Sequence, residues 1–389
     1  MQQHTPQEQP QATATGRRSL TLGIPAPVHD RRLPLTPEGV SIITGYGMEV
    51  WVQHGAGTCV NYDDGRYAAA GARMSDRAAA LDCDFVVSVE PLAAEDAGRI
   101  RRGAALFTLD AAVTGAAALD ALLKRRVSAL ALRNIRDGHG RRPFDDAVSE
   151  ISGRAAVTMA VARLAEVDAG AAAGKGILVG GVAGVIPCEV VIIGSGIAAR
   201  AAAASALGLG ATVRLFDDDT YGLRKAMEML GGRLICSSLQ PHVLRNAVAS
   251  ADVIVATPMS LSYEISAATI ATAKRGVLAY DLTDNGTGTL AGFEPVDMAC
   301  AALRASEGGR RCYCNLSASV PRTTAMALSN GVTALIPLLV GRHGANDVAG
   351  LEAGVQGAAY TYKGYVTDAA LAREMSVRYV DIAIFGRLS

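Results

Sequence analysis

A glycine-rich segment near the middle of the chain has the residue types and spacing that bind a dinucleotide. Gly194, Gly196 and Ala199 occupy the G-x-G-x-x-A positions of that pattern, and Ile197 begins the helix expected after it. The first glycine permits a tight turn, the second lets the backbone approach a pyrophosphate, and the small Ala199 lets the helix pack on a strand. The free N–H groups at the helix start then point toward the phosphates.

An acidic residue follows where such a site needs one. Asp217 ends the next apolar run, 23 residues after Gly194. A carboxylate at this point can accept hydrogen bonds from the ribose hydroxyls of the adenosine half. The same carboxylate would repel a 2′-phosphate, so the sequence favours NAD over NADP as the cofactor. Asp218 and Asp219 follow directly, so the assignment could shift by one residue.

The segments around this pattern have the order expected of a parallel, doubly wound α/β sheet. Its strands are predicted at residues 189–193, 211–216, 251–257 and 276–281. Ligands bind beyond the carboxyl ends of such strands. This rule places Thr257 and Asp284 near the nicotinamide end of the cofactor.

The N-terminal part of the chain is predicted to form another α/β domain. Thr36 is placed to cap a helix that begins at Pro37. Strands are expected at residues 19–24, 49–53 and 85–89. An Ala-rich helical segment from Asp146 to about Gly170 is long enough to connect the two domains, and a further long helix is expected from Thr323 to Val340.

Composition and charge narrow the class of ligand. The chain has 389 residues, enough for two domains, with 50% hydrophobic residues, 42 glycines and few aromatics, a balance typical of α/β enzymes. Lys and Arg together number 37, as do Asp and Glu, so no net field favours nucleic acid or an anionic membrane. A small neutral or zwitterionic ligand is expected, with no nucleic-acid or membrane partner.

The cysteines and the chain start suggest a cytoplasmic protein without a metal site. Seven cysteines are scattered without a C-x-x-C pair, and Cys312 and Cys314 have no second ligand pair nearby. No apolar run reaches the roughly 20 residues that a membrane span needs. Residues 1–18 are rich in Gln, Pro and Thr and are expected to form a disordered tail.

These motifs, with several others, resemble the alanine dehydrogenase and pyridine nucleotide transhydrogenase family. Ser195 and Ala199 depart mildly from the usual glycine or alanine and glycine of its dinucleotide signature. The likeness extends over nearly the whole chain after residue 18. It is carried by residues 192–199, 208–213, 23–25, 32, 35–40, 54–57, 90–91, 106–108, 149–154, 180–182, 317–324 and 362–364.

The resemblance implies the architecture and the assembly. It implies two Rossmann-like α/β domains, in which a doubly wound NAD-binding domain is inserted into a discontinuous substrate domain. On that basis we expect the NAD-binding domain at residues 148–315 and the substrate domain at residues 19–147 and 316–389. The family also implies a homo-oligomer, either a dimer or a hexamer.

The resemblance also implies roles for individual residues. Arg32 is expected to hold the substrate carboxylate, which suits the bidentate geometry of a guanidinium. Asp284 and Asn315 match polar positions beside the nicotinamide and the substrate, and Ser149 matches a cofactor-binding position. The residues alone leave alternatives open: Arg32 as a solvated loop charge, and Asp284 as the cap of the Asn285-Gly286 turn.

Two catalytic positions of the family are not present in this chain. The family has Lys before Glu-Pro, where this chain has Val89 before Glu90-Pro91, and the family's His after the Phe-Thr strand is missing from residues 107–111. Hydride transfer from an amino acid needs a base and a group that polarises the carbonyl. Candidate replacements are Asp284, Asp110, Glu90 and His29. For Asp110 an N-cap role in the next helix is the stronger interpretation, and for Glu90 and His29 a structural or surface role.

Three functions therefore stay open. The first is an NAD-dependent oxidoreductase acting on an amino acid, imine or 2-oxo acid other than alanine and pyruvate, with Asp284 in proton transfer. The second is an opine-type reductive aminase similar to saccharopine dehydrogenase. The third is a non-catalytic NAD-binding paralogue. A redox-neutral use of bound NAD, as in cyclodeamination, is a minor further alternative.

Overall fold

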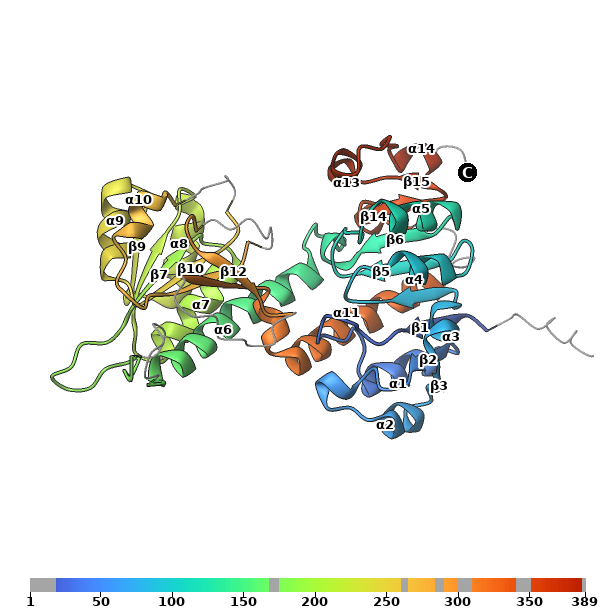
Figure 1. Ribbon diagram of the computed structural model, residues 1–389, viewed down its shortest axis with the longest axis horizontal. Helices are drawn as coiled ribbons and strands as arrows, with labels where there is room; N and C mark the ends of the chain where they lie inside the picture. The colour runs from blue at the N-terminus through green and yellow to red at the C-terminus, as the bar shows by residue number, and fades with distance from the viewer. Residues whose placement is uncertain are drawn as a thin grey trace, which may run out of the picture.

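The computed structural model describes residues 19–167, 175–259, 265–283, 290–299, 310–340 and 351–386. These residues form two lobes, each built around one β-sheet, and two long helices run between the lobes (Figure 1). Within the described residues the first sheet has eight strands and the second has seven.

The first sheet takes strands from both ends of the described chain. Its spatial order is β15 (Tyr365–Val366), β14 (Ala359–Tyr362), β6 (Ser128–Ala131), β5 (Ala105–Thr108), β4 (Phe85–Val87), β1 (Thr21–Ile24), β2 (Glu49–Gln53) and β3 (Arg73–Ser75). The strands from β1 to β6 pair in parallel, whereas β14 is antiparallel to both β6 and β15. Because β14 and β15 return from the C-terminal part, the second lobe is inserted into a discontinuous first lobe, as expected.

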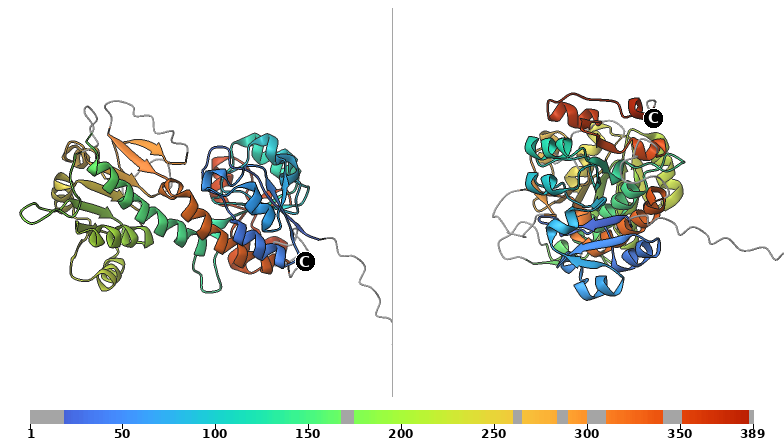
Figure 2. Two further views of the ribbon diagram at one scale, coloured as in Figure 1. Left: turned by 90° about the horizontal axis from the view of Figure 1, so that it is seen from below. Right: turned by 90° about the vertical axis from the view of Figure 1, so that its right-hand side faces the viewer.

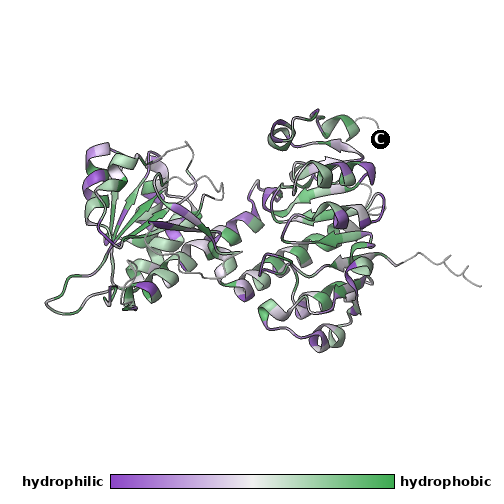
Figure 3. Cartoon of the chain, viewed as in Figure 1, coloured by the Kyte–Doolittle hydropathy of each residue, from purple (hydrophilic) through white to green (hydrophobic). Residues whose placement is uncertain are grey.

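The second sheet is parallel throughout its described strands. Its spatial order is β12 (Glu294–Asp297), β13 (Arg311–Cys314), β11 (Leu278–Asp281), β10 (Val253–Ala256), β7 (Glu189–Ile193), β8 (Thr212–Phe216) and β9 (Leu234–Ser237). Such a sheet is covered by helices on both faces, which explains the continuous apolar runs of β7 and β10. Figure 3 shows these strands as the most hydrophobic part of the lobe.

Helices alternate with the strands in both lobes. The first lobe contains α1 (Pro37–Gly45), α2 (Asp64–Ala69), α3 (Arg77–Leu81), α4 (Ala94–Arg99), α5 (Ala116–Lys124), α12 (Ala353–Gln356), α13 (Ala369–Glu374) and α14 (Ala383–Gly386). The second contains α7 (Ile197–Gly208), α8 (Thr220–Leu230), α9 (Pro241–Ser250) and α10 (Ala267–Ala271). Short 3₁₀ turns are η1 (Thr58–Val60), η2 (Leu132–Asn134) and η3 (Leu316–Ser319). No helix in the described parts of the chain is long and apolar enough to cross a membrane.

Two long helices connect the lobes. They are α6 (Pro143–Ala165) and α11 (Pro321–Val340), and Figure 2 shows them running side by side from one lobe to the other. The helix α6 also packs closely on α7, where a Cβ atom at Gly153 would overlap the carbonyl of Ala198. These helices correspond to the connector predicted from Asp146 and the helix predicted from Thr323.

Each sheet has a switch point, where the order of the strands reverses and the connections that follow two neighbouring strands run to opposite faces of the sheet. In the first sheet the point lies between β1 and β4, and in the second between β7 and β10. The loops that leave neighbouring strands in opposite directions open a crevice beyond the carboxyl ends of those strands. Each lobe therefore has one switch point of the kind at which such sheets bind ligands.

Most local predictions from the sequence are confirmed, and one is wrong. The hydroxyl oxygen of Thr36 accepts a hydrogen bond from the N–H of Gly39, so Thr36 caps α1 as expected. Asp110 does not cap the next helix, because α5 begins at Ala116 with Gly115 at the cap position. The four residues between Asp110 and Gly115 form an irregular loop, and the carboxylate of Asp110 pairs with Arg133 instead.

Candidate functional site

The dinucleotide turn stands at the crevice of the second sheet. Gly194 directly follows β7 with a φ of +100°, a conformation that favours glycine, and a Cβ there would overlap the hydroxyl of Thr257. That hydroxyl donates to the carbonyl of Ile193 at 2.9 Å, so Thr257 holds the ends of β7 and β10 together. Gly196 is the N-terminal cap residue of α7 and is exposed.

The remaining predicted cofactor residues lie where the pattern places them, although the roles assigned to them stay predictions. Ile197 is the first residue of α7, and Ala199 is fully buried on the sheet side of that helix. Asp217 follows β8 and is buried at 5% exposure. Its carboxylate accepts hydrogen bonds from the hydroxyl of Ser195 at 2.7 Å and from the N–H of Asp219 at 3.1 Å.

A cavity of about 320 Å³ opens between the turn and Asp217. Its lining includes two cations that the sequence analysis did not select, Arg200 and Lys225. The guanidinium of Arg200 donates to the carbonyl of Ser195 at 2.6 Å and so holds the turn. The complete lining is Ser195, Gly196, Arg200, Asp217, Asp219, Tyr221, Gly222, Lys225, Pro258 and Met259.

Shape and charge of this cavity fit a dinucleotide. Gly196 leaves open space at the start of α7, where the first backbone N–H groups of a helix are a favourable place for phosphate. Arg200 and Lys225 add positive charge, and Asp217 adds acceptors for hydroxyl groups. One signal for Lys225 was available in the sequence, since only a few lysines occur in this Arg-rich chain.

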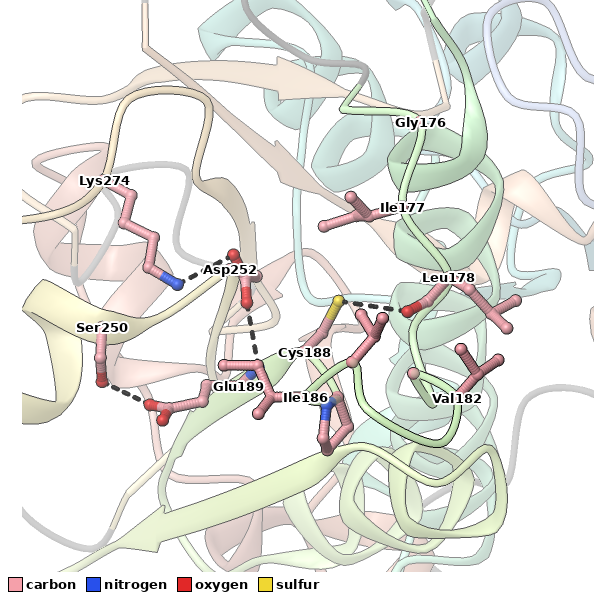
Figure 4. Close-up of a pocket in the computed structure, with 13 residues that line it drawn as sticks. Gly176, Ile177, Leu178, Val182, Ile186, Cys188, Glu189, Ser250, Asp252 and Lys274 are labelled. Atoms are coloured by element: carbon pink, nitrogen blue, oxygen red, sulfur yellow. Dashed lines mark hydrogen bonds and ion pairs between the residues drawn. The ribbon is translucent and has the colours of Figure 1, made fainter.

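A larger cavity of about 510 Å³ lies elsewhere in the second lobe (Figure 4). It surrounds Glu189 and Asp252, which lie at the amino ends of β7 and β10, opposite the dinucleotide turn. Both Lys274 and Lys175 pair with the carboxylate of Asp252 at 3.1 Å. Burial alone would raise the pKa of Asp252, but the N–H of Glu189 and the two lysines together hold it below its ordinary value.

On the first lobe, Arg32 is buried in the loop that follows β1. Its guanidinium forms a bidentate pair with Asp30, with Nη2 to Oδ2 at 2.5 Å and Nε to Oδ1 at 3.0 Å. Its Nη1 donates to the hydroxyl of Ser317 at 2.8 Å. Ser317 belongs to η3, which follows the second-sheet strand β13, so Arg32 joins the carboxyl edges of the two sheets.

Glu90 supports this loop from the neighbouring strand. Its carboxylate accepts hydrogen bonds from the N–H groups of Val28 at 2.5 Å, His29 at 3.0 Å and Asp30 at 3.0 Å. Both oxygens of the carboxylate therefore accept hydrogen bonds from the backbone, which agrees with a structural role for Glu90. Val89, where the family has lysine, is 5% exposed and packs in the hydrophobic core.

A chain of ion pairs lies beside these residues at the same sheet edge. The N–H of Arg133 donates to the carbonyl of Leu109, which places Arg133 beyond the ends of β5 and β6. Its guanidinium pairs with Asp145 of α6 at 2.7 Å and with Asp110 at 3.3 Å. Burial, and then the charge of Asp145, raise the pKa of the adjacent Asp146. Arg133 could not be selected from the sequence, because only the pairing of β5 with β6 brings it to this edge.

The other predicted site residues are distributed as follows. Asn315 separates β13 from η3 in a left-handed conformation with a φ of +56°, so it lies at the same edge as Ser317. Ser149 is half-buried in α6 between the lobes. Asp284 lies outside the described residues. In the described parts of the chain, no group of three His, Cys, Asp or Glu side chains is arranged to hold a metal ion.

A parallel sheet with a dinucleotide turn at its crevice, joined by two long helices to another α/β sheet, defines a two-domain Rossmann-like protein. The model for the alanine dehydrogenase/PNT N-terminal domain matches residues 24–153, and the model for the C-terminal domain matches residues 160–369. The chain belongs to the alanine dehydrogenase/PNT family, a family of oxidoreductases, as its sequence motifs predicted.

Known proteins similar to this chain agree with the assignment. The alanine dehydrogenase of Mycobacterium tuberculosis (strain ATCC 25618 / H37Rv) is 30% identical, over 94% of this chain and 99% of that protein. The alanine dehydrogenase of Bacillus subtilis (strain 168) is 28% identical, over 93% and 96%.

Solved structures show the same fold. An L-alanine dehydrogenase superposes with a TM-score of 0.79 at 23% identity, covering 91% of this chain and 98% of that one. A transhydrogenase from Sinorhizobium meliloti superposes with a TM-score of 0.72 at 19% identity, covering 90% and 99%. The predicted fold class, two Rossmann-like domains with one inserted into the other, is confirmed.

Proposed function

We propose that this chain is an NAD-dependent oxidoreductase that acts on an amino acid, imine or 2-oxo acid other than alanine. The observation that carries the proposal is Val89. A buried apolar side chain stands where the family has a lysine, and it belongs to the hydrophobic core. A valine can neither polarise a carbonyl nor bind a carboxylate, so the substrate must be held and activated differently from alanine in the family's pattern.

The proposed cofactor site is the cavity beside the dinucleotide turn. Gly194, Gly196 and the first turn of α7 would hold the pyrophosphate, and Asp217 would accept hydrogen bonds from the adenosine ribose. Thr257 would support the turn from β10. Bound NAD supplies the hydride acceptor or donor for the reaction.

The proposed substrate site lies where the two carboxyl edges meet. Arg32 faces Ser317 there, and Asn315 lies two residues before Ser317. A substrate carboxylate reaching Arg32 would have to share the guanidinium with Asp30, because two of its nitrogens already bond to that side chain. We assign the transfer of the substrate's proton to Asp284, which comes three residues after the end of β11 in the sequence.

The experiment that tests this function needs two stages. Purified protein is first titrated with NADH, with fluorescence as the readout, and then supplied with a panel of 2-oxo acids plus ammonia while NADH oxidation is followed. We expect binding, turnover of at least one acid other than pyruvate, and loss of turnover in Asp284→Asn. Full turnover in that variant would contradict the role of Asp284, and pyruvate as the best substrate would contradict the substrate class.

A non-catalytic NAD-binding role is the second candidate, and a specific observation favours it. The guanidinium of Arg32 is already neutralised by the buried carboxylate of Asp30, so an unliganded site is electrostatically satisfied. NADH binding without turnover across the whole panel would support this candidate. An opine-type condensation would instead require a 2-oxo acid and an amino acid together.

Three further parts of the proposal concern the whole protein. We propose that residues 148–315 form the NAD-binding domain and that residues 19–147 and 316–389 form the substrate domain. We propose a cytoplasmic homo-oligomer, a dimer or a hexamer, by analogy with the family. Size-exclusion chromatography with light scattering tests the assembly, and a monomer at micromolar concentration would contradict it.

A further inference from the structure

Ser195 belongs to the dinucleotide turn, and its side chain is buried against the acidic residue that follows the next strand. It lies between the two glycines of the motif, at a position where the family's usual residue has no hydroxyl. In this chain the side chain is buried, and its hydroxyl donates to the carboxylate of Asp217 at 2.7 Å. The turn after β7 and the acid after β8 are thereby joined directly.

The other oxygen of Asp217 is held as well. It accepts the N–H of Asp219 at 3.1 Å, and Asp219 itself caps α8 through the N–H of Tyr221. A carboxylate offers about four acceptor positions, so two remain after these bonds. The two remaining acceptor positions are enough for hydrogen bonds from the two hydroxyl groups of a ribose.

Space around the Ser195 hydroxyl is restricted from the side of α8. A Cβ atom at Gly222 would overlap the hydroxyl oxygen, and would also come within 3.1 Å of the Cβ of Ser195. The hydroxyl therefore occupies a closed position between Asp217 and Gly222, and cannot rotate toward α8. Both residues line the cavity of about 320 Å³.

We propose that Ser195 is a positioning residue that fixes the Asp217 carboxylate toward the adenosine ribose and so sets the preference for NAD over NADP. An aspartate that is free to rotate can turn away from an incoming 2′-phosphate, whereas a carboxylate held at both oxygens cannot. Fixed negative charge then repels the phosphate at full strength, and the ribose hydroxyls meet acceptors that are already oriented. This inference rests on the proposed binding of NAD.

The test compares dissociation constants for NADH and NADPH, measured by fluorescence titration, in the native protein and in Ser195→Ala. We expect the NADH dissociation constant to rise about tenfold, because a hydrogen bond to a charged group contributes free energy of that order. NADPH should bind no more weakly than before, so the preference falls by about tenfold. Ser205→Ala is the matched control, since the Ser205 hydroxyl bonds within α7 to the carbonyl of Ala201.

A double-mutant cycle separates positioning from direct contact with the cofactor. In an Asp217→Asn background, Ser195→Ala should change NADH binding little, because the carboxylate on which it acts is gone. An equal loss in both backgrounds would show that Ser195 touches the cofactor itself and would overturn the inference. An unchanged NADH-to-NADPH ratio in Ser195→Ala would also overturn it.

Gly222→Ala provides an independent variant. It should displace the hydroxyl and reduce the cofactor preference in the native background, and have a smaller effect in Ser195→Ala, where only the contacts of the added carbon with the Cβ at position 195 and the carboxylate of Asp219 remain. Equal effects in both backgrounds would contradict the inference. Failure of the native protein to bind NADH would overturn the cofactor proposal, a result distinct from binding with an unchanged ratio.

Discussion

Arg32 illustrates how one residue can serve both the fold and a site. The sequence alone left two interpretations, a substrate ligand or a solvated charge. Solvation is contradicted by the structure, because the side chain is buried, paired with Asp30 and bonded to Ser317. Its role toward a substrate stays a proposal, and the pair with Asp30 is the feature that any substrate must accommodate.

Removal of this guanidinium should destabilise the protein strongly. Arg32→Ala leaves the buried carboxylate of Asp30 without its cation, which typically costs about 3–5 kcal/mol. Chemical denaturation monitored by circular dichroism measures the loss. Arg31→Ala, at the exposed neighbouring position, is the control and should cost much less. Equal losses in the two variants would show that the pair with Asp30 contributes little.

The ion pairs of Asp252 should make the free energy of unfolding depend on pH in the acid range. Its bonds to Lys175, Lys274 and the N–H of Glu189 lower its pKa in the folded state, relative to about 3.9 when unfolded. A lowered folded pKa means that the stabilisation is fully present above the unfolded value and is lost as the pH falls through the folded value. Asp252→Asn should therefore be less stable at neutral pH by about 1–3 kcal/mol and less sensitive to acid.

The measurement is the free energy of unfolding from pH 7 down to about pH 2, a range that includes the ordinary pKa of aspartate and values below it. Asp120→Asn is the matched control, since Asp120 pairs with Lys124 on an exposed helix face. The control should follow the native curve. Parallel curves for Asp252→Asn and the native protein would contradict the assigned cause.

At this scale, sequence reasoning succeeded where the motif itself dictates geometry. Gly194 requires a left-handed turn, and Asp217 follows the second strand at the expected spacing, so both could be placed without a structure. Arg133 could not, because its partner Asp145 belongs to another element, and the role of Arg200 and Lys225 depends on a cavity that several elements form together. Asp284 lies outside the described residues.

At the scale of elements, the contact between α6 and α7 sets how the second lobe is attached. A Cβ atom at Gly153 would overlap the carbonyl of Ala198, so only glycine allows this approach. Gly153→Ala should destabilise the protein by about 1–3 kcal/mol, the usual cost of overpacking. Thermal unfolding followed by circular dichroism measures the change.

Gly98→Ala is the matched control for that substitution. Gly98 lies in α4 with nothing within 4 Å of the added carbon, and alanine is the better helix former. The control should be neutral or slightly stabilising. A similar loss of stability in both variants would show that the helix contact is not the cause.

The bounds of the strands could be predicted from the sequence where the local pattern of apolar and polar residues determines them. The strands at residues 49–53 and 189–193 were predicted with their observed bounds, and the other predicted strands are shorter than expected by one to three residues. Asp110 was misplaced because a polar residue after a strand suits a helix cap or a turn equally well. Only the ion pair with Arg133, which requires the adjacent strand β6, distinguishes the two.

For the whole molecule, the ion pairs around Arg133 tie the first lobe to the connecting helix. Asp145 belongs to α6, whereas Arg133 belongs to η2 of the first lobe, and their distance is 2.7 Å. Arg133→Gln should speed hydrogen exchange in η2 and in the first turns of α6, because these segments lose a charged contact. Exchange in β7 and β8 serves as the internal control. Uniform acceleration across both lobes would indicate global destabilisation instead.

The pairing of β14 with β6 has a consequence for the order in which the protein matures. Ala359 of β14 lies beside Leu130 of β6, so the first sheet joins residues that leave the ribosome more than two hundred positions apart. The described strands of the second sheet end at Cys314, so no described strand from beyond it takes part in their pairing. During synthesis the inserted lobe can therefore reach its native strand pairing while β6 still has an open edge, and the nascent chain would carry that unprotected edge until β14 has emerged.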